Sequence, residues 1–249
     1  MAYQNTAQQL SKVGILKQDG DRIVLHETFK RTPELNGCLA KSQAAAVNLD
    51  FEVSAVGVVT TALNSNGGFL MTASSADGNR GVVAPHLDTG QSLWATIQWL
   101  AEKEIAINAH FITGATIDDC ILGMGFKKTS TFVTATDEEQ AWFRYEDGVN
   151  GGRWQAITSS TTMATNCTAT GDNAGDTGIT VAASTEYVLT IVLDADKIAR
   201  FFINHEFVYE SPCPLRSTIK LIPYLGVEND AATAVKIIQP ISLTCSRDY

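Results

Sequence analysis

Apolar and polar positions alternate most regularly in the last third of the chain, within residues 187–193 and 198–203. The apolar series there are Tyr187, Leu189, Ile191 and Leu193, then Ala199, Phe201 and Ile203. Successive side chains of a β-strand point to opposite faces, so a period of two predicts strands with one buried face. A turn is expected at 194–197. A two-residue hairpin turn is expected at Asn204-His205.

Two further apolar series occupy odd-numbered positions near the C-terminus. They are Ile219, Leu221, Pro223, Leu225 and Val227, followed by Val235, Ile237, Ile241 and Leu243. We expect these side chains to be buried on one face of the closing strands. Pro240 lacks a backbone N–H and therefore predicts a bulge or a sheet edge in the last strand.

The middle of the chain reads as short β segments separated by clusters of Gly, Asn, Asp and Ser. Residues 105–111 alternate. In residues 120–126 the apolar side chains share one face of the strand, and Gly123 and Gly125 lie on the other face, where another backbone or side chain can approach closely. Residues 147–152 (DGVNGG) predict a hairpin loop. This punctuation is typical of a sandwich or barrel. We therefore predict one β-sandwich domain over 22–249, preceded by an N-terminal extended arm over 1–21.

Two stretches leave the secondary structure open. Residues 92–104 (SLWATIQWLAEKE) fit a helix through Trp94, Ile97 and Ala101, but they also alternate as a strand would. Their Ala, Leu, Gln, Glu and Lys content slightly favours the helix. Residues 159–180 are rich in Thr, Asn and Gly and predict a long loop or a weak ribbon.

Charge and cysteine content narrow the class of protein. The net charge is −9 over 249 residues, which disfavours nucleic acid, and no apolar run is long enough to span a membrane. The N-terminus has no signal-peptide pattern, so synthesis in a reducing cytoplasm is expected. The cysteines, which follow no metal-binding spacing, are expected to be buried small residues: Cys38, Cys120, Cys167, Cys213 and Cys245. The low charged fraction, 18%, hints at oligomerisation.

The C-terminal third resembles the concanavalin A-like lectin/glucanase sandwich. The resemblance rests on Arg200-Phe201-Phe202-Ile203-Asn204, on Phe207-Val208-Tyr209-Glu210-Ser211 and on the two closing strands, and it covers about residues 100–249. It implies an all-β, concanavalin A-like jelly-roll β-sandwich, similar to non-enzymatic sandwich proteins of tailed bacteriophages. One position departs from the family: His205 stands where a hairpin glycine is usual, so we expect a longer turn or another turn type.

A search for catalytic residues finds none. Retaining glucanases need two carboxylates about 5 Å apart, and the resemblance implies a Glu-x-Asp-x-Glu strand that this sequence lacks. The nearest clusters are Asp137-Glu138-Glu139, expected in a solvated turn, then Glu146-Asp147 and Asp118-Asp119. Adjacent strand residues point to opposite faces, so none forms a catalytic pair. We predict no enzyme and no cofactor, while Glu139 and Glu146 remain the residues to test for hydrolysis.

Metal and ligand sites are equally sparse. Asp172, Asn173 and Asp176 could hold calcium, but they also fit ordinary loop chemistry, and no metal site is predicted. The histidines form no metal-binding motif: His26, His86, His110 and His205. His110 is expected at the surface, and Gly67-Gly68 and Gly151-Gly152 are expected to mark hairpins. The tryptophans could stack on sugars but are expected in the core: Trp94, Trp99, Trp142 and Trp154.

These observations predict a non-enzymatic virion structural protein of a bacteriophage. The specific expectation is a trimeric capsid decoration, or cement, protein on the capsid surface, with the major capsid protein and copies of itself as partners and with neither nucleic acid nor membrane. Its arm would add a strand to a neighbour. The alternative is a carbohydrate-binding, lectin-like module on a phage surface or tail. A glycoside hydrolase is the third hypothesis.

Overall fold

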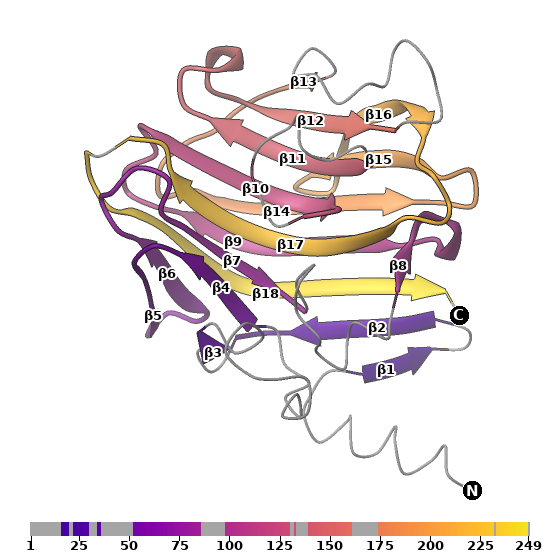
Figure 1. Cartoon of the computed structure of the whole chain (residues 1–249), viewed down its shortest axis with the longest axis horizontal. Helices are drawn as coiled ribbons and strands as arrows, with labels where there is room; N and C mark the ends of the chain where they lie inside the picture. The colour runs from indigo at the N-terminus through magenta and orange to yellow at the C-terminus, as the bar shows by residue number, and fades with distance from the viewer. Residues whose placement is uncertain are drawn as a thin grey trace, which may run out of the picture.

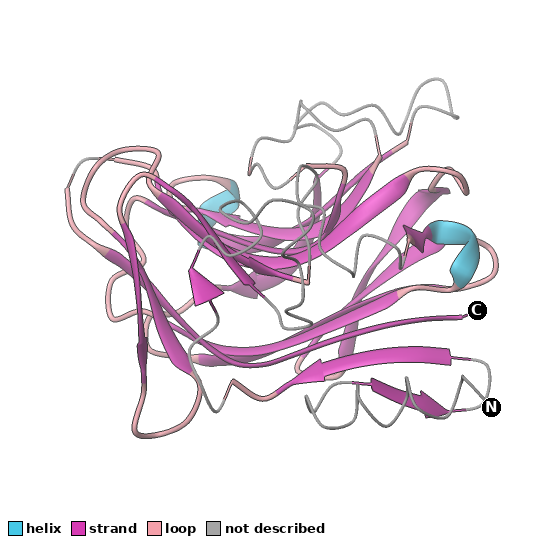
Figure 2. Cartoon of the chain, turned by 60° about the horizontal axis from the view of Figure 1, so that its bottom comes forward, coloured by secondary structure: helices cyan, strands magenta, loops and turns pink. Residues whose placement is uncertain are grey.

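The computed structural model describes residues 16–19, 22–29, 34–35, 52–85, 98–129, 132, 139–160, 174–231 and 233–248. Within them the chain is a sandwich of two β-sheets (Figures 1 and 2). Most of the predicted arm lies outside these residues, and the division into arm and domain stays a prediction. In the described part of the chain, no helix is long and apolar enough to cross a membrane.

One layer, sheet A, has the strand order β1-β2-β18-β9-β14-β15-β16, with β6 also on β18 and β5 on β6. Its strands are β1 (Leu16–Asp19), β2 (Arg22–Glu27), β5 (Val59–Leu63), β6 (Phe69–Ala73), β9 (Ala106–Thr113), β14 (Glu186–Leu193), β15 (Ile198–Ile203), β16 (Glu206–Pro214) and β18 (Lys236–Asp248). All of these pairs are antiparallel.

The other layer, sheet B, has the order β13-β12-β11-β10-β17-β7-β4-β3, with β8 also on β17. Its strands are β3 (Glu34–Leu35), β4 (Glu52–Val56), β7 (Arg80–Ala84), β8 (Trp99–Leu100), β10 (Cys120–Lys127), β11 (Gln140–Glu146), β12 (Arg153–Ser159), β13 (Ala174–Thr180) and β17 (Lys220–Asn229). The short 3-10 turn η3 (Ala101–Lys103) lies between β8 of sheet B and β9 of sheet A, and η5 (Asn150–Gly152) lies between β11 and β12.

The long strand β18 holds two shorter strands end to end along one side. Its residues 243–248 pair with β2, and its residues 236–238 pair with β6, while β9 runs along its other side. In Figure 1, β18 accordingly crosses most of the molecule, with β2 toward one end and β6 toward the other. Between β2 and β6, no described strand pairs with the middle of β18 on that side.

The main core fills the space between the sheets and contains the alternating residues expected from the sequence. Leu189, Ile191 and Leu193 of β14 and Phe201 of β15 are fully buried there. Ile107, Ala109 and Phe111 of β9 meet Leu122, Met124 and Phe126 of β10 in the same cluster. Burial of apolar surface at about 25 cal/mol per Å² makes this cluster the main source of stability. The period-two prediction is confirmed for these strands.

The last predicted apolar series is wrong over most of its length. Val235 is exposed and Ile237 and Ile241 are only half-buried, whereas Ile238 and Leu243 are fully buried. The cause is the bulge that Pro240 predicted: the β18–β9 register shifts between Pro240 and Ser242. An extra residue in one strand exchanges the inner and outer positions, so a single odd-numbered series cannot hold through it.

One other local expectation fails. In β17, Ile222 and Tyr224 are buried as well as Leu221 and Leu225, so this strand is covered on both faces rather than one. Segment 92–104, which the sequence left open between helix and strand, is described from residue 98 onward and forms the short strand β8 followed by η3. The weak ribbon expected in 159–180 is present as β13, with residues 161–173 outside the described part.

The hairpin turn at Asn204-His205 has two residues, as the alternation predicts, but it keeps the turn type that His205 was expected to prevent. Asn204 has φ 51° and His205 has φ 71°, and both central residues of a type I′ turn require positive φ. Phe202 pairs with Phe207, and Ile203 pairs with Glu206. The expected change of turn is therefore wrong, and a non-glycine residue occupies a strained conformation.

The cysteines are not all alike. Cys120 and Cys245 are buried free thiols, as expected, and burial raises the pKa of Cys120 to about 12 and that of Cys245 well above its usual value. Cys213 is also buried, as expected, but it is disulfide-bonded rather than free.

Candidate functional site

The outer face of sheet B is closed by a second apolar cluster. Its members are Val82, Ala84, Ile121, Phe132, Trp142, Ile157, Ile222 and Tyr224, all at most 5% exposed. Phe132 lies over β10 and β17, where a Cβ on Gly123 or Gly226 would collide with its ring. The close approach predicted for Gly123 is thus confirmed. The rings of the described residues at the centre of this face, Phe132, Trp142 and Tyr224, are therefore not accessible to a ligand.

Buried polar groups at one end of this closed face interact with each other. Lys127 is fully buried; its Nζ donates to Gln140 Oε1 at 2.9 Å and lies 4.5 Å from the centre of the Trp142 ring. Trp142 Nε1 donates to the same oxygen at 3.0 Å. A charge in such a setting must be stabilised by hydrogen bonds and by the aromatic face. Lys127 and Gln140 therefore pack against Trp142 and stabilise the covered face of sheet B.

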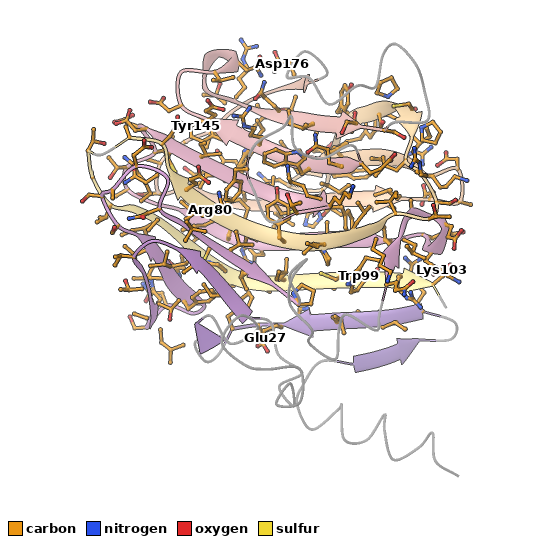
Figure 3. The ribbon with its side chains drawn as sticks, viewed as in Figure 1. Glu27, Arg80, Trp99, Lys103, Tyr145 and Asp176 are labelled. Carbon is orange, nitrogen blue, oxygen red and sulfur yellow. The ribbon has the colours of Figure 1, made fainter. Side chains whose placement is uncertain are left out.

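Ion pairs occupy the opposite end of the same face, where Figure 3 labels Arg80. Arg144 pairs with Glu146, and Arg80 pairs with Glu228 at 3.4 Å. Burial lowers the pKa of Arg144 and raises the pKa of Glu228. Each charge is partly buried and has an opposite charge beside it, as folding requires.

The carboxylates considered for hydrolysis do not converge. Glu139 and Glu146 lie at opposite ends of β11, roughly 24 Å apart at the usual rise per strand residue. Glu139 is buried rather than in a solvated turn, and its oxygens accept hydrogen bonds from Ser160 and from the Arg216 backbone N–H. The solvated position expected for Glu139 is wrong. Asp137 and Glu138 lie outside the described residues.

The three described tryptophans do not offer a sugar-stacking surface. Trp99, Trp142 and Trp154 are fully buried, which agrees with the core interpretation, and Trp94 lies outside the described residues. Trp154 lies within a group of edge-to-face aromatic pairs with Phe111, Phe143, Tyr145 and Tyr187.

The loop considered for calcium uses Asp176 differently. Its carboxylate accepts from Arg153 at 2.6 Å, from Asn150 Nδ2 at 3.1 Å and from the Gly178 N–H at 2.8 Å. These contacts lower the pKa of Asp176, the Gly178 bond most strongly. Its oxygens are thus engaged by donors. No group of three or more His, Cys, Asp or Glu among the described residues is arranged to hold a metal, and Asp172 and Asn173 are not described.

The outer face of sheet A is open and polar. Across neighbouring strands, His26 Nδ1 and Thr244 Oγ1 lie 2.7 Å apart, and Asn108 Nδ2 donates to Thr190 Oγ1 at 2.6 Å. His110 Nε2 lies 2.6 Å from Glu186 Oε1, and the His110 side chain is 28% exposed. The surface position expected for His110 is confirmed.

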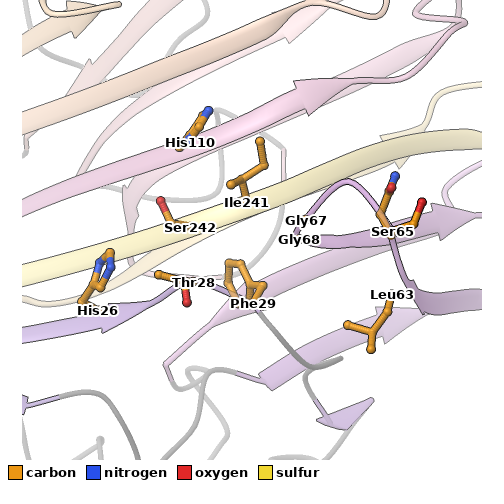
Figure 4. A pocket seen from close by; sticks show the side chains of 11 residues that line it. His26, Thr28, Phe29, Leu63, Ser65, Gly67, Gly68, His110, Ile241 and Ser242 are labelled. Atoms are coloured by element: carbon orange, nitrogen blue, oxygen red, sulfur yellow. The ribbon is translucent and has the colours of Figure 1, made fainter.

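A notch of about 590 Å³ opens on this face, between the end of β2 and the β5–β6 turn (Figure 4). It occupies the interval where β18 has neither β2 nor β6 beside it. Its lining residues are His26, Thr28, Phe29, Leu63, Asn64, Ser65, Gly67, Gly68, His110, Ile241 and Ser242. None of them is Lys, Arg, Asp or Glu.

The wall made by the β5–β6 turn is fastened to β18. Gln239 Oε1 accepts from Asn64 Nδ2 at 3.0 Å, and Gln239 Nε2 donates to the Gly67 carbonyl at 2.7 Å. Gly68, at φ 71°, packs so closely on the Pro240-Ile241 backbone that a Cβ would collide with the Pro240 carbonyl. The notch is therefore held open by contacts within the protein.

The opposite wall contains a strained residue. Phe29 has φ 45°, in the left-handed region that bulky residues avoid, and its fully buried ring packs edge-to-face on Phe69 at 5.0 Å. Glu27 Oε1 accepts the Phe29 N–H at 2.9 Å. Backbone strain of this kind costs about 1–3 kcal/mol and gathers at functional sites.

The sequence does not predict this notch as a site. Gly67 and Gly68 indicate only a hairpin turn, and His110 indicates only a surface position. Pro240 was the available signal, because a bulge re-aims neighbouring side chains. What the sequence could not show is that the end of β2 and the β5–β6 turn meet over that bulge.

No family model and no curated protein matches the chain. Solved structures do match. A protein of unknown function from Shewanella oneidensis MR-1 has a TM-score of 0.60 at 12% identity, covering 97% of this chain and 93% of that one. The potassium-bound carbohydrate recognition domain of Emp46p has a TM-score of 0.53 at 7% identity, covering 84% and 94%. An alginate lyase of polysaccharide lyase family 7, AlgAT5, has a TM-score of 0.50 at 11% identity, covering 74% and 81%.

These likenesses confirm the fold as a concanavalin A-like jelly-roll sandwich. They also correct one expectation. The prediction of a non-enzyme rested on the missing glucanase triplet, yet the same fold occurs in an alginate lyase. The missing triplet therefore excludes one hydrolytic mechanism and not enzymatic activity in general.

Proposed function

We propose that the chain is a carbohydrate-binding protein of lectin type that holds a neutral saccharide in the notch on sheet A. The observation that carries the proposal is the chemistry of the lining, which combines imidazole, hydroxyl and amide groups with the accessible apolar side chains of Leu63 and Ile241 and contains no ordinarily charged side chain among the described residues. Sugar hydroxyls both donate and accept hydrogen bonds, and these side chains do the same.

The size and rigidity of the notch fit a small polar ligand. Its volume falls within the range of about 300–1,000 Å³ usual for small-molecule sites. Because Gln239 and Gly68 fix the turn wall in advance, binding would require little ordering of the protein, which favours affinity.

The fold supports carbohydrate binding in general, but not a particular sugar. One structural neighbour is named as a carbohydrate recognition domain, and another as an enzyme acting on alginate. The described part of the lining contains no Arg or Lys, which favours a neutral sugar over an acidic one, because an acidic sugar needs a cation or several N–H donors as partners.

The test is a glycan array followed by calorimetry on the strongest neutral oligosaccharide. His110→Ala should weaken binding about five- to tenfold, the effect of losing roughly one hydrogen bond. Ser242→Phe should abolish binding by filling the floor of the notch. His205→Asn, a histidine change at the distant hairpin, is the matched control and should leave the affinity unchanged.

Three results would contradict the proposal. One is a folded protein that binds no neutral glycan. Another is binding that Ser242→Phe leaves intact. The third is a preference for uronate oligosaccharides over neutral ones.

The virion role stays a prediction from the sequence. Capsid decoration, the major capsid protein as partner, the capsid-surface location and the trimer are all open to direct measurement. Cosedimentation with expanded shells that lack the protein would support the role, and failure to bind them would remove it. Glycan binding by a protein attached to such a shell would agree with both hypotheses.

A further inference from the structure

We infer that two copies of this chain associate through β5, pairing antiparallel to extend sheet A across both copies. The inference does not rest on what the notch binds, although Leu63 belongs both to the notch lining and to the β5 edge. It rests on the hydrogen-bonding edge of β5, on the absence of charge around it and on the contrast with the other edge strands of the described chain.

In the described residues, β5 pairs with β6 alone, so its other side is an edge of sheet A. The Ser74 N–H donates to the Val58 carbonyl, and the Asn64 N–H donates to the Gly68 carbonyl. Hydrogen-bonded positions alternate along an antiparallel pair, so even-numbered residues of β5 direct their N–H and C=O toward β6. Those of Val59, Thr61 and Leu63 therefore point outward, along the free edge.

This edge lacks the features that normally keep sheet edges apart. Residues 53–76 include no Asp, Glu, Lys or Arg, although the whole chain has a net charge of −9. The strand also contains no proline, and its pairing with β6 has no register shift. Charges, prolines and bulges are the usual devices against edge-to-edge association, and β5 has none of them.

The other ends of the sheets are better protected. At the opposite edge of sheet A, β16 (EFVYESPCP) contains two glutamates and two prolines, and its pairing with β15 is irregular. Beside β2, β1 (LKQD) contains a lysine and an aspartate. At one edge of sheet B, β13 contains Asp176 and two glycines and also has an irregular register. At the other edge of sheet B, β3 (EL) contains a glutamate. Among the described edge strands longer than two residues, only β5 therefore has an uncharged edge with a regular register.

Exposed apolar side chains flank the strand. Val58 precedes β5 and Leu63 ends it, and they are 63% and 55% exposed. A second copy paired along β5 would cover both. With a twofold axis at Thr61, Val59 of one copy would lie opposite Leu63 of the other, and each outward N–H would meet a carbonyl. The edge is thus complementary to itself.

The experiment measures the mass of the full chain in solution across a range of concentrations, by analytical ultracentrifugation. A dimer is expected. Thr61→Pro removes an outward N–H that β6 does not use, so it should raise the dimer dissociation constant at least tenfold while the fold persists. Ala62→Lys, which adds a charge at an exposed position of β5, should do the same and keeps the test decisive if the proline variant fails to fold.

Ala183→Lys places the same charge in an exposed turn remote from β5 and is the matched control, which should remain dimeric. Hydrogen exchange supplies a second measurement: the amides of Val59, Thr61 and Leu63 should become protected as the protein concentration rises. A chain that stays monomeric, a trimer, or a dimer that Ala62→Lys leaves intact would each overturn the inference.

Discussion

The outer faces of the two sheets differ in what covers them. The outer face of sheet B carries Trp142, Tyr224 and Phe132, all buried, with ion pairs at one end and the buried Lys127 at the other. The outer face of sheet A carries histidines, hydroxyls and amides that remain partly exposed and surround a notch. The aromatic and charged side chains on the outer face of sheet B are therefore used for packing. The neutral polar side chains on the outer face of sheet A are accessible to ligands.

The largest expected effect tests whether the aromatic face of sheet B is truly part of the core. Trp142→Ala should lower the free energy of unfolding by about 3–5 kcal/mol, because it opens a cavity under Phe132 and Tyr224. Phe207→Ala on sheet A, where the ring is 57% exposed, should cost less than about 1 kcal/mol. Urea unfolding of both variants measures the difference, and equal losses would contradict the comparison.

The next effect concerns the wall of the notch. Gly68→Ala should destabilise the protein by about 2 kcal/mol or more, since it combines an unfavourable φ with a collision against the Pro240 carbonyl. Gly148→Ala has nearly the same φ, 73°, but open space around the added Cβ, and is the matched control. Thermal unfolding of the pair isolates the collision, and equal losses would show that the turn can move away from β18.

A smaller effect of opposite sign is expected at the hairpin of sheet A. His205→Gly should raise the free energy of unfolding by up to about 1 kcal/mol, because glycine adopts φ 71° without strain and the gain exceeds its extra unfolded-state entropy. Urea unfolding measures the change. A loss of stability would show that the histidine side chain makes a stabilising contact that outweighs its strain.

The smallest expected effect is the pH dependence of the free energy of unfolding, which differs between a carboxylate near sheet B and one on sheet A. Near the ion pairs of sheet B, burial and the neighbouring Asp77 raise the pKa of Asp230. The folded state then binds the proton more tightly than the unfolded state, so this group makes stability fall as pH rises from the ordinary carboxyl range through the raised pKa. Asp230→Asn should remove that fall.

Asp196 on sheet A should behave in the opposite way. Its hydrogen bonds from Arg200 and from the Ile198 N–H lower its pKa, so its contribution is present above the unfolded pKa and is lost as pH falls through the lowered one. Asp196→Asn should therefore flatten the acid side of the profile. Free energies of unfolding measured between about pH 3 and 7 cover both windows, and the same sign for both variants would contradict the assignment.

The sequence predicted the fold well where one face of a strand is buried and poorly where two faces are. Residues 187–203 alternate because sheet A is open on its outer side, and their strands and turns were found as expected. In β17 both faces are buried, so apolar Ile222 and Tyr224 obscure the alternation. In β18 Pro240 predicts a bulge, but the odd-numbered apolar series does not show that this bulge exchanges the inner and outer positions of the strand.

The candidate site was less predictable because its parts come together only in three dimensions. His26, the β5–β6 turn, His110 and Ser242 belong to four separate segments of the chain. No spacing within one segment could indicate that they meet. Phe29 and His205, both non-glycine residues at positive φ, show the same limit, since neither conformation is favoured by its residue type.

The end-to-end arrangement of β2 and β6 along β18 has a consequence for how the notch can change. The distance between its walls depends on where β2 stops and on how far the β5–β6 turn extends, not on the side chains that line it. Adding or removing a residue in that turn should widen or narrow the notch while the ladder between β2 and β18 stays in register. The site can thus be resized through loop length alone, which leaves the sandwich beneath it free to remain unchanged.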